Sequence, residues 1–160
     1  MVLKWIKAIT EWLCRFPRLR REYIEVGGLK WALQNAGTDA ENPGGRLYTW
    51  KEAIKLESDE WRLPTRAELE EFLKDTFFGF DEERKVGIFV DRKTGARLKL
   101  PAAGYLKLFS TLEREGERGE YWSLDEYDSN GVYYMYFFNE GFGVYDNDKS
   151  TGNSVRLVRR

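Results

Sequence analysis

The last quarter of the chain carries the pattern that most limits how it can fold. Residues 121–154 hold ten aromatic side chains, interleaved with Asp, Asn, Ser, Thr and Gly. Residues 133–138 read Tyr-Tyr-Met-Tyr-Phe-Phe. The two-residue period of a β-strand places their odd-numbered and even-numbered side chains on opposite faces. We expect the odd-numbered set to hold a sheet together and the even-numbered set to be exposed.

Composition narrows the chemistry that such a chain can perform. Its 160 residues include no histidine and one cysteine, with 26 Lys and Arg against 27 Asp and Glu. Histidine-based nucleophile activation and histidine-containing zinc sites are therefore excluded, and one cysteine can form neither an all-cysteine zinc site nor an intrachain disulfide. A net charge near zero argues against a general nucleic-acid-binding protein. We expect no cofactor, no metal and no nucleic-acid partner.

One acidic cluster leaves an enzyme open as a minor alternative. Asp125, Glu126 and Asp128 lie close together in the sequence, and paired carboxylates can act as general acid and base. Acids cluster often on protein surfaces, so we expect a protein that is not an enzyme. The acidic run over residues 146–148 is either a solvated loop or a bias toward basic partners.

The N-terminal 21 residues are expected to form a separate unit. Apolar side chains recur every three or four positions over residues 2–16, which predicts an amphipathic helix that Pro17 ends. Six basic residues and one acidic residue lie in this unit. The helix either docks on the rest of the chain, or joins copies of the chain into a homo-oligomer, or lies at a membrane surface.

The sequence predicts neither a membrane span nor a signal peptide. No stretch reaches the roughly 18 apolar residues that a spanning helix needs. Lys7, Glu11 and Arg15 interrupt the region that would be the apolar part of a signal peptide. We expect a protein that is cytoplasmic as synthesised, or that joins a virion or leaves the cell by another route.

The middle of the chain shows two helix starts among strands. The Thr-x-x-Glu sequences at 49–52 and 65–68 match the capping box that begins a helix. Residues 22–33 indicate two strands around a Gly-Gly turn, and residues 86–100 indicate a hairpin. We expect an α+β fold: two helices packed on a small, mainly antiparallel sheet, with the extra N-terminal amphipathic helix.

Several motifs, taken in order, resemble one family. They are Gly28–Ala32, Trp61–Thr65, Leu100–Tyr105, Tyr121–Ser123 and Ser154–Arg159. Together they resemble the Fibrobacter succinogenes major paralogous domain, a branch of the C-type-lectin-like fold. The resemblance implies one domain over residues 22–160, in which the first and last strands pair, two helices pack on the sheet and the C-terminal half presents a ligand.

The motif residues themselves are expected to be structural. Trp31, Trp61 and Trp122 are best explained as core aromatics. Arg62 and Arg156 are best explained as hydrogen-bonding forks that tie segments together. None of these five side chains is expected to touch a ligand.

Residues 121–156 resemble a narrower group, the variable regions of diversity-generating retroelement target proteins. In such proteins adenine-directed mutagenesis rewrites Asn-type codons between fixed scaffold residues, which here would include Tyr133, Met135 and Phe137. Tyr supplies a large, rigid contact area at low entropic cost, and Ser, Gly and Asn supply adaptable hydrogen bonds. The expected ligand-binding residues are Tyr127, Asn130, Tyr134, Tyr136, Phe138, Tyr145, Asp146, Asn147, Asp148, Ser150 and Asn153.

These patterns predict a non-enzymatic, phage- or bacterium-encoded protein that displays diversified residues on a lectin-like scaffold and binds a protein ligand through its C-terminal aromatic face. The alternative is a non-diversified structural or adhesion module of a surface appendage or phage particle. Calcium-dependent sugar binding is disfavoured, because the Glu-Pro-Asn, Gln-Pro-Asp and Trp-Asn-Asp signatures are absent. Asp146 and Asp148 alone do not supply the six or more oxygen ligands that calcium takes.

Overall fold

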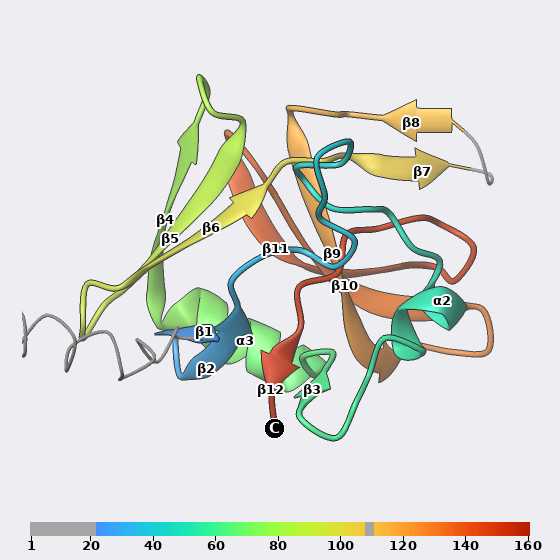
Figure 1. Ribbon diagram of the computed structural model, residues 1–160, viewed down its shortest axis with the longest axis horizontal. Helices are drawn as coiled ribbons and strands as arrows, with labels where there is room; N and C mark the ends of the chain where they lie inside the picture. The colour runs from blue at the N-terminus through green and yellow to red at the C-terminus, as the bar shows by residue number, and fades with distance from the viewer. Residues whose placement is uncertain (1–21, 108–110) are drawn as a thin grey trace, which may run out of the picture.

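The computed structural model describes residues 22–107 and 111–160 (Figure 1). Of these residues, 48% lie in strands and 10% in helices, and the strands form several small antiparallel sheets. The expected α+β, C-type-lectin-like arrangement of two helices on one sheet is therefore wrong, and this part of the chain is mostly β. The helix expected over residues 2–16 lies outside the described residues.

Both described helices begin at the predicted capping boxes, but both are short. Helix α2 spans Trp50–Ile54 and helix α3 spans Arg66–Lys74. Thr49 and Thr65 are their N-caps, and each threonine hydroxyl accepts a hydrogen bond from the backbone N–H of the Glu three residues later. After α3 the chain enters a strand at Thr76. Two such short helices cover parts of sheets and form no layer of their own, which is why the helix-start signals overstated the helical content.

The first sheet brings the two ends of the described chain together. Its strand order is β1–β2–β12–β3, with β1 at Tyr23–Val26, β2 at Leu29–Ala32, β3 at Trp61–Arg62 and β12 at Val158–Arg159. Strands β1 and β2 pair antiparallel, which confirms the hairpin predicted at the Gly-Gly turn. Strand β12 pairs with β2 and β3, so the C-terminal strand lies inside this sheet.

The second sheet is a three-stranded meander in the order β4–β5–β6. Its strands are β4 at Thr76–Asp81, β5 at Val86–Asp91 and β6 at Arg97–Pro101. The pairing of β5 with β6 confirms the predicted hairpin. The backbone N–H of Gly27 donates a 2.7 Å hydrogen bond to Oδ2 of Asp91, which ties this sheet to the turn of the first.

The third sheet contains the aromatic-rich segment. Its order is β11–β10–β9, with β9 at Arg118–Glu126, β10 at Gly131–Phe138 and β11 at Gly141–Asp148. A separate hairpin of β7 (Tyr105–Lys107) and β8 (Thr111–Glu113) precedes it. The register pairs even-numbered β10 residues with even-numbered β9 residues. We call the side of the sheet that carries the even-numbered β10 residues the even face, and the other side the odd face.

The odd face is sealed by a hydrophobic core. Met135 and Phe137 are fully buried there, in a cluster that includes Trp31, Phe72 and Phe89. The rings of Phe137 and Phe89 lie 5.6 Å apart. Helix α3 contacts all three strands of the sheet, and the second sheet supplies further side chains to the cluster. The predicted burial of the odd-numbered side chains is therefore confirmed for these two residues, whereas Tyr133 is only half-buried.

The even face is covered at one end only. Val132 and Tyr134 pack there with Trp50 of α2 and Trp122 of β9 in a second, smaller core. Farther along β10, Tyr136 and Phe138 are partly exposed. One strand thus has a sealed face and a half-open face.

The motif residues hold these parts together much as predicted. Trp31 and Trp122 are buried, whereas Trp61 is only half-buried at the edge strand β3. Arg62 donates two hydrogen bonds to the carboxylate of Glu68, at 2.7 and 2.6 Å. Arg156 donates from Nε to Asn35 at 2.8 Å and from Nη1 to the carbonyl of Ala32 at 3.0 Å. Both arginines are structural forks. Neither described helix is long and apolar enough to cross a membrane.

Candidate functional site

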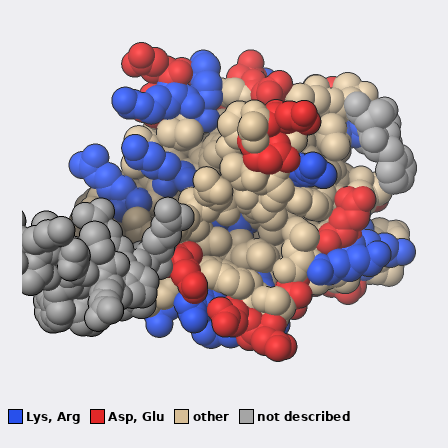
Figure 2. Space-filling model, in the orientation of Figure 1, with Lys and Arg blue, Asp and Glu red and all other residues tan. Residues whose placement is uncertain are grey.

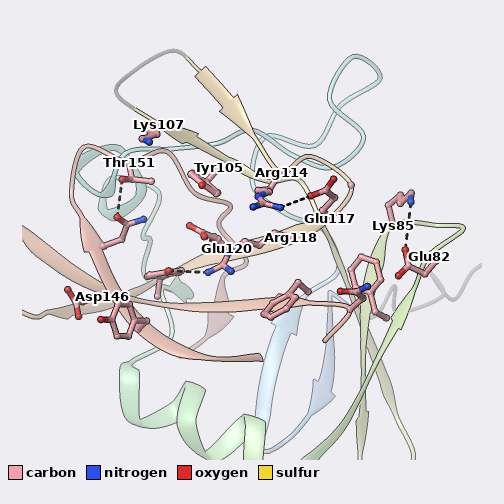
Figure 3. Close-up of a pocket in the computed structure, with 17 residues that line it drawn as sticks. Glu82, Lys85, Tyr105, Lys107, Arg114, Glu117, Arg118, Glu120, Asp146 and Thr151 are labelled. Atoms are coloured by element: carbon pink, nitrogen blue, oxygen red, sulfur yellow. Dashed lines mark hydrogen bonds and ion pairs between the residues drawn. The ribbon is translucent and has the colours of Figure 1, made fainter. Parts of the chain in front are cut away.

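A hollow of about 920 Å³ opens over the even face of the third sheet. Strands β9, β10 and β11 supply its floor, and strand β7, the turn from β8 into β9 and the β4–β5 turn supply its walls (Figure 3). Aromatic and charged side chains from these elements converge on it. Hollows of this kind are the usual binding sites of small molecules and of side chains that project from a partner.

Arg118 is held near the middle of the hollow, between a carboxylate and two aromatic rings. Its Nε donates to Oε1 of Glu120 at 2.6 Å, and its Nη2 donates to the hydroxyl of Tyr134 at 3.3 Å. The guanidinium carbon lies 4.6 Å from the ring centre of Tyr136 and 5.8 Å from that of Phe138. Charge-assisted hydrogen bonds and cation–π contacts strengthen away from bulk water, so the guanidinium is fixed in place.

Glu120 is buried beneath Arg118, with 3% of its surface exposed. Burial raises the pKa of its carboxyl, and the Arg118 guanidinium opposes that rise. When the Asn153 amide nitrogen faces it, Oε2 of Glu120 accepts a 3.1 Å hydrogen bond. The carboxylate of Glu120 therefore orients the Arg118 guanidinium from below.

The aromatic part of the floor depends on glycines in the neighbouring strand. The rings of Tyr136 and Phe138 stack with centroids 6.3 Å apart and planes 22° apart. Their partners on β11 are Gly143 and Gly141. A Cβ at position 143 would lie 2.8 Å from the Tyr136 hydroxyl, so glycine leaves room for the ring. Next on β11, Tyr145 is 65% exposed and borders the hollow.

The charges that line the hollow balance. Four are basic and four acidic, namely Lys85, Lys107, Arg114, Arg118, Glu82, Glu117, Glu120 and Asp146. Two of the ion pairs lie at the exposed rim: Lys85 with Glu82 at 3.9 Å, and Arg114 with Glu117 at 3.2 Å. Figure 2 shows the same close mixing of basic and acidic side chains over one face of the molecule. The site therefore offers one fixed positive charge, that of Arg118, among lining charges that sum to zero.

Five of the eleven predicted ligand-binding residues line this hollow: Tyr134, Phe138, Tyr145, Asp146 and Asn147. All come from the neighbouring strands β10 and β11. A sixth predicted residue lies beside them, because the ring of Tyr136 stacks on Phe138 under Arg118. Five of these six residues share the even face, whereas Asp146 pairs with Tyr133 and lies on the odd face by register, although it borders the hollow.

The remaining predicted residues lie elsewhere. Tyr127 and Asn130 are exposed around the turn from β9 to β10, and the ring of Tyr127 packs edge-on against Tyr133. Asp148 and Ser150 pair with each other, since the serine hydroxyl donates to the carboxylate at 2.6 Å. These four residues are outside the hollow.

Two predicted contact residues are not exposed. Tyr134 is 6% exposed because α2 and Trp122 cover its end of the even face, and this burial raises its pKa to about 12. Asn153 is completely buried and exchanges backbone hydrogen bonds with Tyr48. Strand alternation assigns Tyr134 to a face, but it cannot show that a helix packs on one end of that face.

The acidic cluster considered for catalysis is engaged in structure. Asp125 accepts a 2.6 Å hydrogen bond from the backbone N–H of Arg66 at the start of α3. Glu126 accepts from Nζ of Lys149 at 2.8 Å. Asp128 accepts from two backbone N–H groups of the turn that follows it, at 2.8 and 2.7 Å. Within residues 22–107 and 111–160, no group of three or more acidic or thiol side chains could hold a metal ion.

The residues that dominate the hollow were missed from the sequence. Arg118 and Glu120 open β9, and Tyr105 and Lys107 come from β7. A signal was present, because Arg118, Glu120 and Trp122 are spaced two apart and must share a face of one strand. What no local pattern revealed is that this face adjoins the even-numbered aromatics of β10.

Comparison with known families gives one match. Residues 69–158, more than half of the chain, match a family described as a domain of unknown function, DUF8237. The chain belongs to this DUF8237 family. No curated protein and no solved structure matches it. The DUF8237 region runs from α3 to β12, and every residue that lines the hollow lies within it. The hollow is therefore built from the part of the chain that defines the family.

Proposed function

We propose that this DUF8237 protein is a non-enzymatic binding protein whose ligand is another protein, held on the even face of the third sheet. The observation that carries the proposal is the convergence of Tyr136, Phe138 and Tyr145 around Arg118 at an open hollow. Tyr and Arg are enriched at protein interfaces, where a large side chain fills a pocket and contributes most of the binding free energy.

Two features support binding over catalysis. The buried carboxylate, Glu120, accepts a hydrogen bond from Arg118, and its other oxygen accepts one when the Asn153 amide nitrogen faces it, so this group serves to hold Arg118. The chain also contains no histidine, the commonest general base, that could activate the exposed tyrosines beside the hollow. The groups present can recognise a ligand by shape, stacking and hydrogen bonding.

We further propose that the exposed part of this face is diversified, as in retroelement variable proteins. Phe138, Tyr145, Asp146 and Asn147 suit this role, because they border the hollow and can change without opening a core. Tyr134 and Asn153 belong to the scaffold instead, because both are buried. The DNA flanking the gene tests this part: it should hold a near-repeat of the codons for residues 121–156 and a reverse transcriptase gene. If it holds neither, diversification fails and the binding proposal stands.

Selection of peptides tests the binding proposal directly. A random peptide library displayed on phage is selected on the full-length protein, and enriched peptides are measured by biolayer interferometry. Peptides should bind the wild type and the control Phe77→Ser, which removes an exposed aromatic ring from β4, outside the hollow. Binding should fall about thirtyfold or more with Tyr145→Ser, the loss of about 2 kcal/mol at which an interface residue counts as a hot spot. Absence of enriched peptides, or equal losses in both variants, would contradict the proposal.

A non-diversified structural module is the second candidate, favoured by the burial of Tyr134 and Asn153 among the residues expected to vary. In that case the aromatic face packs on another subunit. Light scattering of the full-length protein and of Tyr145→Ser separates the two. An assembled wild type that falls to monomer in the variant indicates self-packing, and equal masses argue against it.

A further inference from the structure

We propose that Arg118 is the anchor for a carboxylate of the protein ligand, and that the aromatic side chains around it receive an apolar residue next to that carboxylate. The protein source of the carboxylate rests on the function proposed above. The chemistry itself, a carboxylate with an apolar neighbour, rests on the geometry of the hollow.

Arg118 is held in place before any ligand arrives. Its Nε is bound by Glu120 at 2.6 Å, its Nη2 lies 3.3 Å from the Tyr134 hydroxyl, and its flat face lies over Tyr136. An arginine that is already ordered loses little side-chain entropy when it binds an anion. Glu120 is therefore a positioning residue for the guanidinium.

The edge of the guanidinium that Glu120 leaves unused is the edge that binds carboxylates. Among residues 22–107 and 111–160, none accepts a hydrogen bond from Nη1 of Arg118, and its side chain is 26% exposed. A carboxylate can accept two parallel hydrogen bonds from the two terminal nitrogens of an arginine. Arg118 lines the hollow, so a ligand in the hollow can reach this edge (Figure 3).

The charge of the hollow favours a singly charged group over a polyanion. Its four basic side chains are matched by four acidic ones, so it has no excess of positive charge to neutralise a phosphate chain. Glu120 lies close enough to repel a ligand anion, but its second oxygen is hydrogen-bonded to Asn153 and its charge is paired with Arg118. One carboxylate, with a single delocalised charge, fits this balance best.

The surroundings of Arg118 select what accompanies the carboxylate. Phe80, Tyr105, Phe138 and Tyr145 line the same hollow, from four different strands. Aromatic side chains bury apolar and aromatic groups with an energy beyond that of area alone. The preferred ligand element is thus an aromatic or aliphatic residue that bears, or adjoins, a carboxylate.

The test uses the full-length protein labelled with ¹⁵N and defined small probes. N-acetyl-L-phenylalanine presents a terminal carboxylate, N-acetyl-L-aspartyl-L-phenylalaninamide presents a side-chain carboxylate, and N-acetyl-L-phenylalaninamide presents none. Titrations are followed by the ¹⁵Nε–¹H signals of the arginines. We expect a saturable shift of the Arg118 signal with the first or second probe, and affinity about tenfold or more lower for the amide, as charge-assisted hydrogen bonds imply. The better of the two acids identifies the source of the carboxylate.

Matched variants locate the binding. Arg118→Gln should lower the affinity for the better acid by about 10- to 100-fold, and Arg118→Lys, which keeps a charge beside Glu120 but loses the fork, should lower it less. Arg92→Gln is the control, because Arg92 also stacks on a ring, Phe77 at 3.9 Å, but lies outside the hollow. The affinity of Arg92→Gln for the better acid should match that of the wild type.

Two results would overturn the inference: no saturable shift of the Arg118 signal in the millimolar range, or equal affinities of wild type for acid and amide. The second comparison uses wild type alone, so a folding defect in a variant leaves the test intact. The outcome of the peptide selection does not depend on this inference, because the selection also enriches peptides that have no carboxylate and still bind the even face. Peptides that need Tyr145 but bind equally well to Arg118→Gln would end this inference and leave the proposed function standing.

Discussion

The two faces of strand β10 come from one alternating sequence but differ in how far their side chains are buried. On the odd face, Phe137 is fully buried against Phe89, Phe78 and Tyr121. On the even face, its neighbour Phe138 is partly exposed beside an arginine. The difference arises from what covers each face: α3 and the second sheet on one side, and on the other a smaller cluster that includes α2, Leu63 and Val155 and covers one end only. Coverage, more than side-chain type, decides whether an aromatic stabilises the fold or is available to a ligand.

The strongest test of this difference between the faces removes one aromatic ring from each of them. Phe137→Ala should lower the free energy of unfolding by about 3–5 kcal/mol, because it opens a cavity in the first core. Phe138→Ala should cost clearly less, because water already reaches part of that ring. Urea denaturation followed by tryptophan fluorescence measures both. Similar losses for the two variants would show that the even face is as tightly packed as the odd face.

A second prediction concerns a substitution that adds volume on the odd face. A Cβ at position 119 would lie 2.2 Å from the Phe137 ring, so Gly119→Ala should cost about 1–3 kcal/mol through overpacking. Gly79→Ala is a matched control on β4, since a Cβ there meets nothing within 4 Å. The same denaturation experiment compares them. If Gly119→Ala is no more costly than its control, the contact between Phe137 and β9 is looser than the structure shows.

The third prediction concerns the covered end of the even face. Tyr134→Phe removes the hydroxyl that accepts from Arg118 at 3.3 Å while the ring stays packed on Trp122. Loss of one hydrogen bond of this kind should cost about 0.5–1.5 kcal/mol. Thermal and urea unfolding measure the change. A loss as large as that of Phe137→Ala would mean that the Arg118 cluster, and not the first core, holds the sheet together.

The smallest expected effect is a change in how the free energy of unfolding depends on pH. Burial raises the pKa of Glu120 above its ordinary value, so the folded state binds its proton more tightly than the unfolded state. The stability that this group contributes is therefore present at low pH and falls as the pH rises through the raised pKa. Glu120→Gln removes this term, so the stability of wild type relative to Glu120→Gln should decline between pH 4 and pH 7.

Phe137→Ala supplies the control for that measurement. The odd face carries no titratable group at this position, so the cost of Phe137→Ala should be the same at both pH values. A pH-independent difference between wild type and Glu120→Gln would show that the Arg118 ion pair fully offsets the burial of the carboxyl.

Local signals in the sequence predicted individual elements well. The capping boxes start α2 and α3, the Gly-Gly turn joins β1 and β2, and the β5–β6 hairpin forms where the turn residues placed it. They failed for the fold class, because a cap marks where a helix begins and carries little information on its length. They also missed that the even face of β10 lies beside Arg118 and Glu120 of β9.

The sequence by itself determined the chemistry that is available and the two faces of the aromatic strand. The absence of histidine and the period-two alternation are properties of neighbouring residues, and both can be read without knowing how the chain folds back. Only the tertiary structure decided which aromatic side chains are exposed. It buried Tyr134 and Asn153 and placed Arg118 in the lining of the hollow, because burial depends on which distant segments pack together.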